Sequence, residues 1–93
     1  MRMATITAWL KINEDRVVQT LREAGEKLDG PDGEVVLDVS SLRRIDSGAL
    51  RAMEEFAGLA RDKGVKVVLR SVNVDIYKVL KLVKLTSQFS FAS

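Results

Sequence analysis

The residues best placed to do chemistry lie in one short stretch, Asp46-Ser47-Gly48, in which a hydroxyl group follows a carboxylate. Two interpretations of this stretch are open. Asp46 or Ser47 at the start of a helix accepts a hydrogen bond from a backbone N–H group, which stabilises the helix by about 1 kcal/mol and needs no further role. Alternatively, Ser47 is a phosphoacceptor, because the N–H groups and the dipole at a helix start stabilise a phosphate.

Charged residues flank this stretch on its N-terminal side. Arg43 and Arg44 are either solvated loop charges or contacts to an acidic partner surface or to a phosphate on Ser47, since a guanidinium group makes bidentate contacts to both. Asp38 and Asp46 bracket the same connection. They do not form the phosphoacceptor site of a response regulator, because the clustered acidic pocket for Mg²⁺ and the longer doubly wound chain are missing.

The composition excludes several classes of site. The chain has 93 residues, no cysteine and no histidine, which excludes disulfides, thiolate metal sites, cysteine nucleophiles and histidine bases. Its net charge is only +2, from 15 basic and 13 acidic side chains, whereas nucleic-acid binders usually carry a strongly basic face. The sequence has neither a glycine-rich phosphate loop nor a nucleophile–base pair. We therefore expect no catalytic residue, no metal, no cofactor and no nucleic-acid partner.

Length and hydropathy predict one domain over residues 1–93. No segment reaches the roughly 20 apolar residues of a membrane span, and the apolar run near the N-terminus is too short for a signal peptide. We therefore expect a cytoplasmic domain that does not insert into a membrane.

The elements that must position Ser47 follow from hydrophobic periodicity. Alternation predicts a half-buried strand over residues 4–12. The only tryptophan, Trp9, is either an exposed contact residue or partly buried, and we expect it to be partly buried. Asn13 is predicted to cap a following amphipathic helix, which a turn at residues 29–33 ends. An apolar strand over residues 34–39 then leads through a polar connection to a second helix at residues 47–63.

The remaining third of the chain repeats the pattern. A strand at residues 65–69 follows Gly64, which suits the left-handed end of a helix. Asn73 or Asp75 is predicted to cap a third helix, on which Lys78, Lys81 and Lys84 are typical of a solvated face. A short strand with Phe89 and Phe91 on one face closes the chain. The resulting β-α-β-α-β-α-β order predicts an α/β fold with a central, largely parallel sheet of about four strands and about three helices.

The block from Asp38 to Leu50 resembles the STAS domain, the fold of bacterial anti-sigma-factor antagonists and of the cytoplasmic tails of sulphate transporters. In that family an apolar strand ends in an Asp-x-Ser-like turn. An apolar residue, an Asp, one or two small hydroxyl residues, a Gly and a Leu then open a helix. The stretches KGVKVVL and VLKLVKL also match, and the resemblance covers residues 6–91. The matching residues in the block are Asp38, Val39, Ser40, Ile45, Asp46, Ser47, Gly48 and Leu50.

This resemblance implies a STAS-like domain with a mixed central sheet that switches between partners. The unphosphorylated domain would bind an anti-sigma factor, itself a serine kinase, through a surface that includes Asp38, Arg43, Arg44 and residues 46–48. Phosphorylation of the hydroxyl would end the binding. The N-terminus is shorter than is usual in the family, so the sheet would keep an open edge that invites self-association into a homodimer.

One departure from the family pattern bears on the phosphorylation. The antagonists commonly carry Asp-Ser-Ser-Gly-Leu and are phosphorylated on the second hydroxyl, a position that Gly48 occupies here. A second branch of the family has a Thr followed by two glycines at this point and forms the small subunit of lipid-transporting ABC complexes, which binds the ATPase subunit. The Ser47-Gly48 pair is closer to that branch than a double Ser would be. Both partners, a kinase and an ABC ATPase, therefore stay open.

Overall fold

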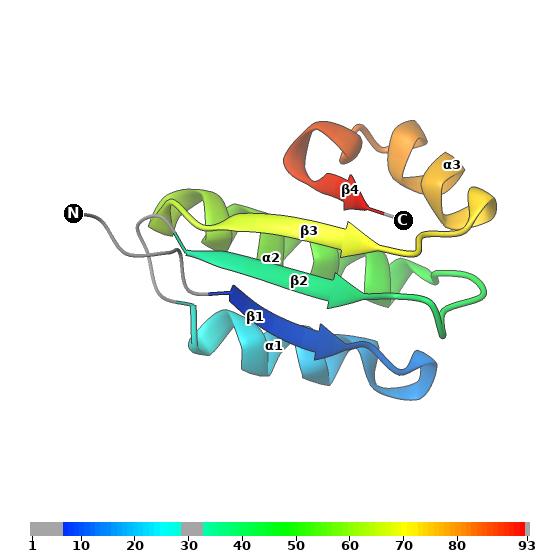
Figure 1. Cartoon of the computed structure of the whole chain (residues 1–93). Coiled ribbons are helices and arrows are strands. Elements are labelled where there is room, and N and C mark those ends of the chain that lie inside the picture. Colours follow the sequence, from blue (N-terminus) through cyan, green and yellow to red (C-terminus); the bar gives the residue numbers. More distant parts are fainter. Residues whose placement is uncertain (1–6, 29–32, 93) are drawn as a thin grey trace.

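The structure is a computed structural model that describes residues 7–28 and 33–92. Its four strands form one parallel sheet in the order β1-β2-β3-β4, so that strands adjacent in the chain are also adjacent in the sheet (Figure 1). The predicted α/β fold class is confirmed. The sheet is wholly parallel among the described residues, whereas the family resemblance implied a mixed one. The strands are β1 (Thr7–Lys11), β2 (Glu34–Asp38), β3 (Lys66–Arg70) and β4 (Ser90–Ala92).

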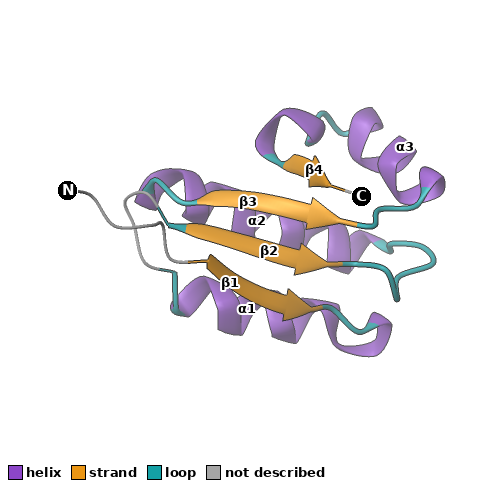
Figure 2. Cartoon of the chain, viewed as in Figure 1, coloured by secondary structure: helices purple, strands orange, loops and turns teal. Residues whose placement is uncertain are grey.

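Three α-helices make the crossovers between these strands, and the predicted order of elements is confirmed. α1 and α2 cover one face of the sheet, while α3 lies beside β4 (Figure 2). Among the described residues no helix covers the opposite face of the sheet, although Val36 and Val68 of the central strands are buried there, at 7% and 9% exposure. The helices are α1 (Val17–Glu26), α2 (Ser47–Lys63) and α3 (Val74–Leu82), with short 3₁₀ turns η1 (Glu14–Arg16) and η2 (Thr86–Gln88).

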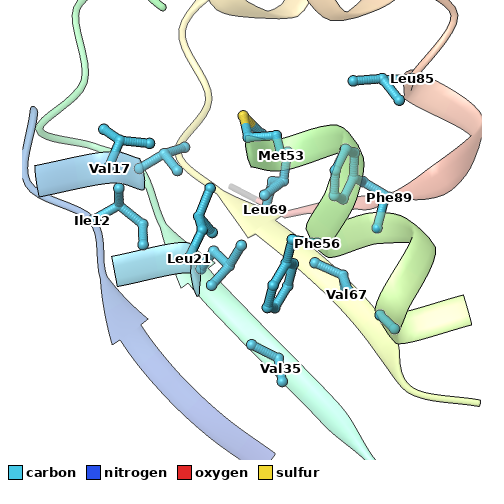
Figure 3. Packing of buried hydrophobic residues seen from close by; sticks show 14 of the residues in the cluster. Ile12, Val17, Leu21, Val35, Met53, Phe56, Val67, Leu69, Leu85 and Phe89 are labelled. Atoms are coloured by element: carbon cyan, nitrogen blue, oxygen red, sulfur yellow. The ribbon is translucent and has the colours of Figure 1, made fainter. Parts of the chain in front are cut away.

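The hydrophobic core lies between the sheet and the two covering helices. Alternate residues of β2 and β3 point into it, and their registers match, with Val35 opposite Val67 and Leu37 opposite Leu69. Phe56 of α2 belongs to the same buried cluster (Figure 3). Because each strand contributes every second side chain to one face, β2 and β3 together present a continuous apolar surface to the helices.

Both ends of α2 follow from local sequence, and its predicted bounds, residues 47–63, are confirmed. At the N-terminus the Asp46 carboxylate accepts a hydrogen bond from the Ala49 N–H group at 2.8 Å. At the C-terminus Gly64 adopts φ 72°, in the left-handed region, where a residue without Cβ is favoured. The long helix that begins at Ser47 is therefore held at each end by a residue suited to that end.

The start of α1 differs from the prediction. Asn13 makes no side-chain capping bond, and its carbonyl instead accepts from the Arg16 N–H group at 3.0 Å in the turn η1. The predicted Asn13 cap of α1 is wrong because the Ile12 N–H group continues the sheet ladder to the Asp38 carbonyl at 2.9 Å. The chain then leaves the strand through a tight 3₁₀ turn, and α1 begins only at Val17.

Trp9 also departs from its prediction, since 59% of its surface is exposed. It alternates with Leu10, which packs against the core, so the indole lies on the face that no described helix covers. The Arg70 guanidinium carbon lies 5.3 Å from the centre of its ring, a cation–π contact.

The predicted turn at residues 29–33, apart from Gly33, and the first residues of the predicted strand at 4–12 lie outside the described residues.

At the far edge of the sheet the two phenylalanines differ in burial. Phe89 is buried, whereas Phe91 in β4 is 37% exposed. The Phe91 ring meets Tyr77 of α3 edge-on, with ring centres 5.3 Å apart, a favourable geometry for aromatic pairs. This contact joins α3 to the last strand.

The two covering helices yield a stability prediction from a pair of glycines. A Cβ atom at Gly58, inside α2, would meet no atom within 4 Å, whereas one at Gly25 of α1 would lie 3.0 Å from the Leu59 Cδ1 atom. Gly58→Ala should raise the free energy of unfolding by about 0.5–1 kcal/mol, because alanine loses less backbone entropy in a helix. Gly25→Ala should gain less or lose stability, since Leu59 must move. Urea denaturation of both variants tests this, and equal gains would contradict it.

Candidate functional site

The β2–α2 corner, residues 38–48, connects the carboxyl end of β2 to the N-terminus of α2. The carboxyl ends of β1 and β3 lie on either side, because Lys11 and Arg70 are in register with Asp38. Ligands and partners of parallel α/β folds commonly bind beyond these strand ends. All six residues predicted for the site, Asp38, Arg43, Arg44, Asp46, Ser47 and Gly48, lie in this one corner.

Asp38 shapes the first turn of the corner. Its side-chain Oδ1 atom accepts a hydrogen bond from the Ser40 N–H group at 3.0 Å, the arrangement of an Asx-turn. The bonds to the backbone and side chain of Ser40 are the main cause that lowers the pKa of Asp38; burial opposes them in part, and the positive charges of Lys11 and Arg70 add smaller lowering effects. Asp38 is therefore a carboxylate at neutral pH whose acceptor atoms already serve the turn.

Asp46 and Ser47 divide the two roles that the sequence left open. Asp46 is the N-cap of α2, with its Oδ1 atom on the Ala49 N–H group. Ser47 is the first residue of the helix, and its side chain is exposed and hydrogen-bonded to no described residue. Because capping is already performed by Asp46, the Ser47 hydroxyl is free to meet another molecule.

Gly48, the second residue of α2, is exposed. A Cβ atom there would meet only the Asp46 Oδ1 atom, at 3.6 Å, and Gly48 is not among the described residues with positive φ. This position therefore accepts a larger side chain without strain, and the glycine is not required by the backbone.

The two arginines occupy different surroundings. Both are exposed, and the backbone N–H group of Arg43 donates to the Glu14 Oε2 atom at 3.4 Å. Arg44 lines, with Asp46, an open groove of about 1010 Å³ between α1 and the start of α2. The other charged residues of the groove are of both signs, namely Glu14, Asp15, Arg16, Arg22, Glu23 and Glu26. The groove is therefore not a built anion site, and Arg44 is the arginine that shares a surface with Asp46.

Asn73 is a further residue of the corner, for which sequence reasoning predicted only a cap. Its Oδ1 atom accepts from the Ile76 N–H group at 2.8 Å, so the predicted cap of α3 is confirmed. Its Nδ2 atom also donates to the carbonyl oxygens of Leu42 at 2.9 Å and Arg43 at 3.1 Å. The sequence carries no signal of this second role, because the partners are about 30 positions away.

An exposed stripe of α3 continues the surface beyond Asn73. Val74 is 67% exposed, Tyr77 42% and Leu82 81%. Val74 and Tyr77, three residues apart, are neighbours on the helix surface, and Leu82 is the last residue of the helix. Lys78 and Lys81 are exposed between them. The corner thus borders a surface that exposes aliphatic side chains and one aromatic side chain, the class of residue in which protein interfaces are enriched.

The described residues offer neither a metal site nor a membrane span. Residues 7–28 and 33–92 contain no group of three or more acidic side chains arranged to hold a metal ion. Within these ranges no helix has both the length and the apolar character to cross a bilayer.

Comparison with solved structures shows where else this arrangement occurs. A protein of Thermotoga maritima assigned as an anti-sigma factor antagonist superposes with a TM-score of 0.70 at 19% identity, over 90% of this chain and 73% of that one. A chain from the structure of the stressosome, a signal integration and transduction hub, superposes with a TM-score of 0.74 at 23% identity, over 99% and 84% of the two chains. At these identities the likeness shows a shared fold.

The sequence comparisons place the chain in a family. No curated protein matches it. Residues 13–87 match the family model described as Mlab, STAS domain, a range that runs from the strand end before η1 to η2 and contains the whole β2–α2 corner. With its four-stranded sheet, its three helices and this match over most of its length, the chain belongs to the STAS domain family.

Proposed function

We propose that the domain is a cytoplasmic, non-catalytic docking module of the anti-sigma-factor-antagonist type, and that its partner binds at the β2–α2 corner. The proposal rests on the exposed hydroxyl group of Ser47 at the N-terminus of α2, which makes no hydrogen bond to the described residues. Asp46 already caps the helix, and Ser47 is exposed. Because the Ser47 hydroxyl neither caps α2 nor packs in the core, a kinase or the surface of a partner can reach it.

The physical basis of a switch at Ser47 is charge. A phosphate would add about −1.5 to −2 charges at neutral pH. At a helix N-terminus the dipole favours this charge, so the fold would tolerate it. A partner surface that packs closely against a neutral serine would instead have to desolvate the phosphate. Phosphorylation would therefore act on the complex and leave the domain folded.

Incubation with the candidate serine-kinase anti-sigma factor and ATP, followed by mass spectrometry, tests the switch. One phosphate on Ser47 in the native chain, absent from Ser47→Ala, is the expected result. Gly48→Ser supplies a second hydroxyl at the position where antagonists commonly carry their acceptor, and the corner has room for it. Phosphate on Gly48→Ser but not on the native chain would overturn phosphorylation as the native switch.

A second candidate is a subunit that binds the ATPase of a lipid-transporting ABC complex. It is favoured by Gly48, because a hydroxyl residue followed by glycine resembles that branch of the family more than a double serine does. Reciprocal co-purification with each candidate partner separates the two proposals. A stable complex with the ABC ATPase, and none with the kinase, would decide for this candidate.

The open edge of the sheet bears on self-association, which stays a prediction. β1 pairs only with β2 among the described strands, and such an edge can pair with a second copy. Light scattering that shows a monomer at high concentration would remove the homodimer from the proposal.

A further inference from the structure

One side chain connects two parts of the surface that are distant in sequence. Asn73 lies at the start of α3, yet its amide nitrogen is bonded to the Leu42 and Arg43 carbonyls in the middle of the β2–α2 corner. These are the only side-chain bonds between α3 or its cap and the corner among the described residues. This amide group therefore makes a direct link between the corner and the start of α3.

The chemistry of the contact requires an amide. The side-chain oxygen is occupied by the Ile76 N–H group, and the nitrogen by two carbonyl oxygens. A carboxylate has the same shape and still accepts the capping bond, but it has no hydrogen to donate and would repel both carbonyls. The two functions of Asn73 can consequently be separated by one substitution.

The corner is held from other directions as well. The Leu42 side chain is 3% exposed, and its N–H group donates to the Val39 carbonyl at 3.0 Å. On the side away from Asn73, the Arg43 N–H group reaches Glu14 at 3.4 Å. The N–H groups of residues 42 and 43 thus donate to one set of partners, and their carbonyls accept from Asn73, so both polar groups of each residue are bonded.

We infer that Asn73 is a positioning residue, which orders the β2–α2 corner ahead of partner binding and ties it to α3. The functional meaning of this inference rests on the proposed docking role of the corner. A segment that is already ordered does not lose conformational entropy when a partner binds. Because Asn73 is bonded to the Leu42 and Arg43 carbonyls, a displacement at the start of α3 would act directly on the corner.

Hydrogen–deuterium exchange of the free domain tests the inference. Asn73→Asp removes the bonds to the two carbonyls, so the corner should open more often. The N–H groups of Leu42 and Arg43, which donate to Val39 and Glu14, should then exchange about tenfold faster, the change expected when one or two neutral hydrogen bonds are lost. The Ile76 N–H group should stay protected because the cap remains. Asn73→Ser, which also caps a helix but is too short to reach both carbonyls, should give the same pattern without a new charge. Asp75→Asn, a change of one charge at the same helix start, should leave the corner unchanged.

Unchanged exchange at Leu42 and Arg43 in both Asn73 variants would overturn the inference. Equal acceleration across α3 and the corner would overturn it too, because it would show a general loss of structure instead of a local one. Neither readout uses a partner, so a failure of the docking proposal would leave both results as they are.

Discussion

Ser47→Asp is expected to weaken binding to the partner by at least about tenfold, since an unpaired charge within an interface costs several kcal/mol and each 1.4 kcal/mol is a factor of ten. The melting temperature should change by less than about 2 °C, because an acidic residue in the first turn suits the helix dipole. Ser47 is exposed and bonded to no described residue, so the substitution removes no contact within the domain. Isothermal titration calorimetry and thermal unfolding measure the two effects.

The matched control for this substitution is Ser87→Asp. Ser87 is also exposed but lies in η2, which follows α3 and is remote in the chain from the corner. The Ser87→Asp substitution introduces the same charge through the same change of side chain, from serine to aspartate. If the two variants lose the same affinity, the effect is one of net charge and the corner is not the interface. If Ser47→Asp binds as tightly as the native chain, the corner is excluded as the docking surface.

Phe56→Ala is expected to lower the free energy of unfolding by about 3–5 kcal/mol, the usual cost of truncating a fully buried phenylalanine. The ring is 2% exposed and lies in the cluster between α2 and the sheet. Because small domains are stable by only about 5–15 kcal/mol, a large part of the stability would be lost. Urea unfolding followed by far-ultraviolet circular dichroism is the suitable measurement, since Trp9 is too exposed to report on the core.

Leu59→Ala provides the comparison on the same helix. Leu59 is 45% exposed, so its truncation leaves no enclosed cavity and should cost less than about 1 kcal/mol. Similar losses in the two variants would show that the packing of α2 on the sheet does not depend on Phe56, contrary to the core described above.

Much of the fold was predictable because its signals are local. Asp46 and Ala49 are three residues apart, as are Asn73 and Ile76, and a capping bond over that distance depends on little besides residue type. Gly64 ends α2 for a similar reason. Asn13 shows the limit of such reasoning, because a sheet bond from the neighbouring Ile12 to Asp38 changed how the chain leaves the strand.

The candidate site was predictable as a location but not as a structure. The resemblance and the strand–turn–helix pattern led to residues 38–48, and the structure has these residues in one corner. That Asp46 performs the capping, and so leaves Ser47 uncommitted, required atomic positions. So did the difference between Arg44, which lines the groove with Asp46, and Arg43, whose backbone is bonded to Glu14.

By itself the sequence determined the order of elements and the bounds of the helix that begins at Ser47, because hydrophobic periodicity and helix-end signals act within a few residues. Only the tertiary structure decided that Trp9 is exposed and that Asn73 holds the carbonyls of Leu42 and Arg43. Those outcomes depend on which face of the sheet the helices cover and on which strand ends become neighbours. Both are set by packing between segments some 30 or more residues apart. The spacing of residue types within one segment carries no information about which distant segment packs against it.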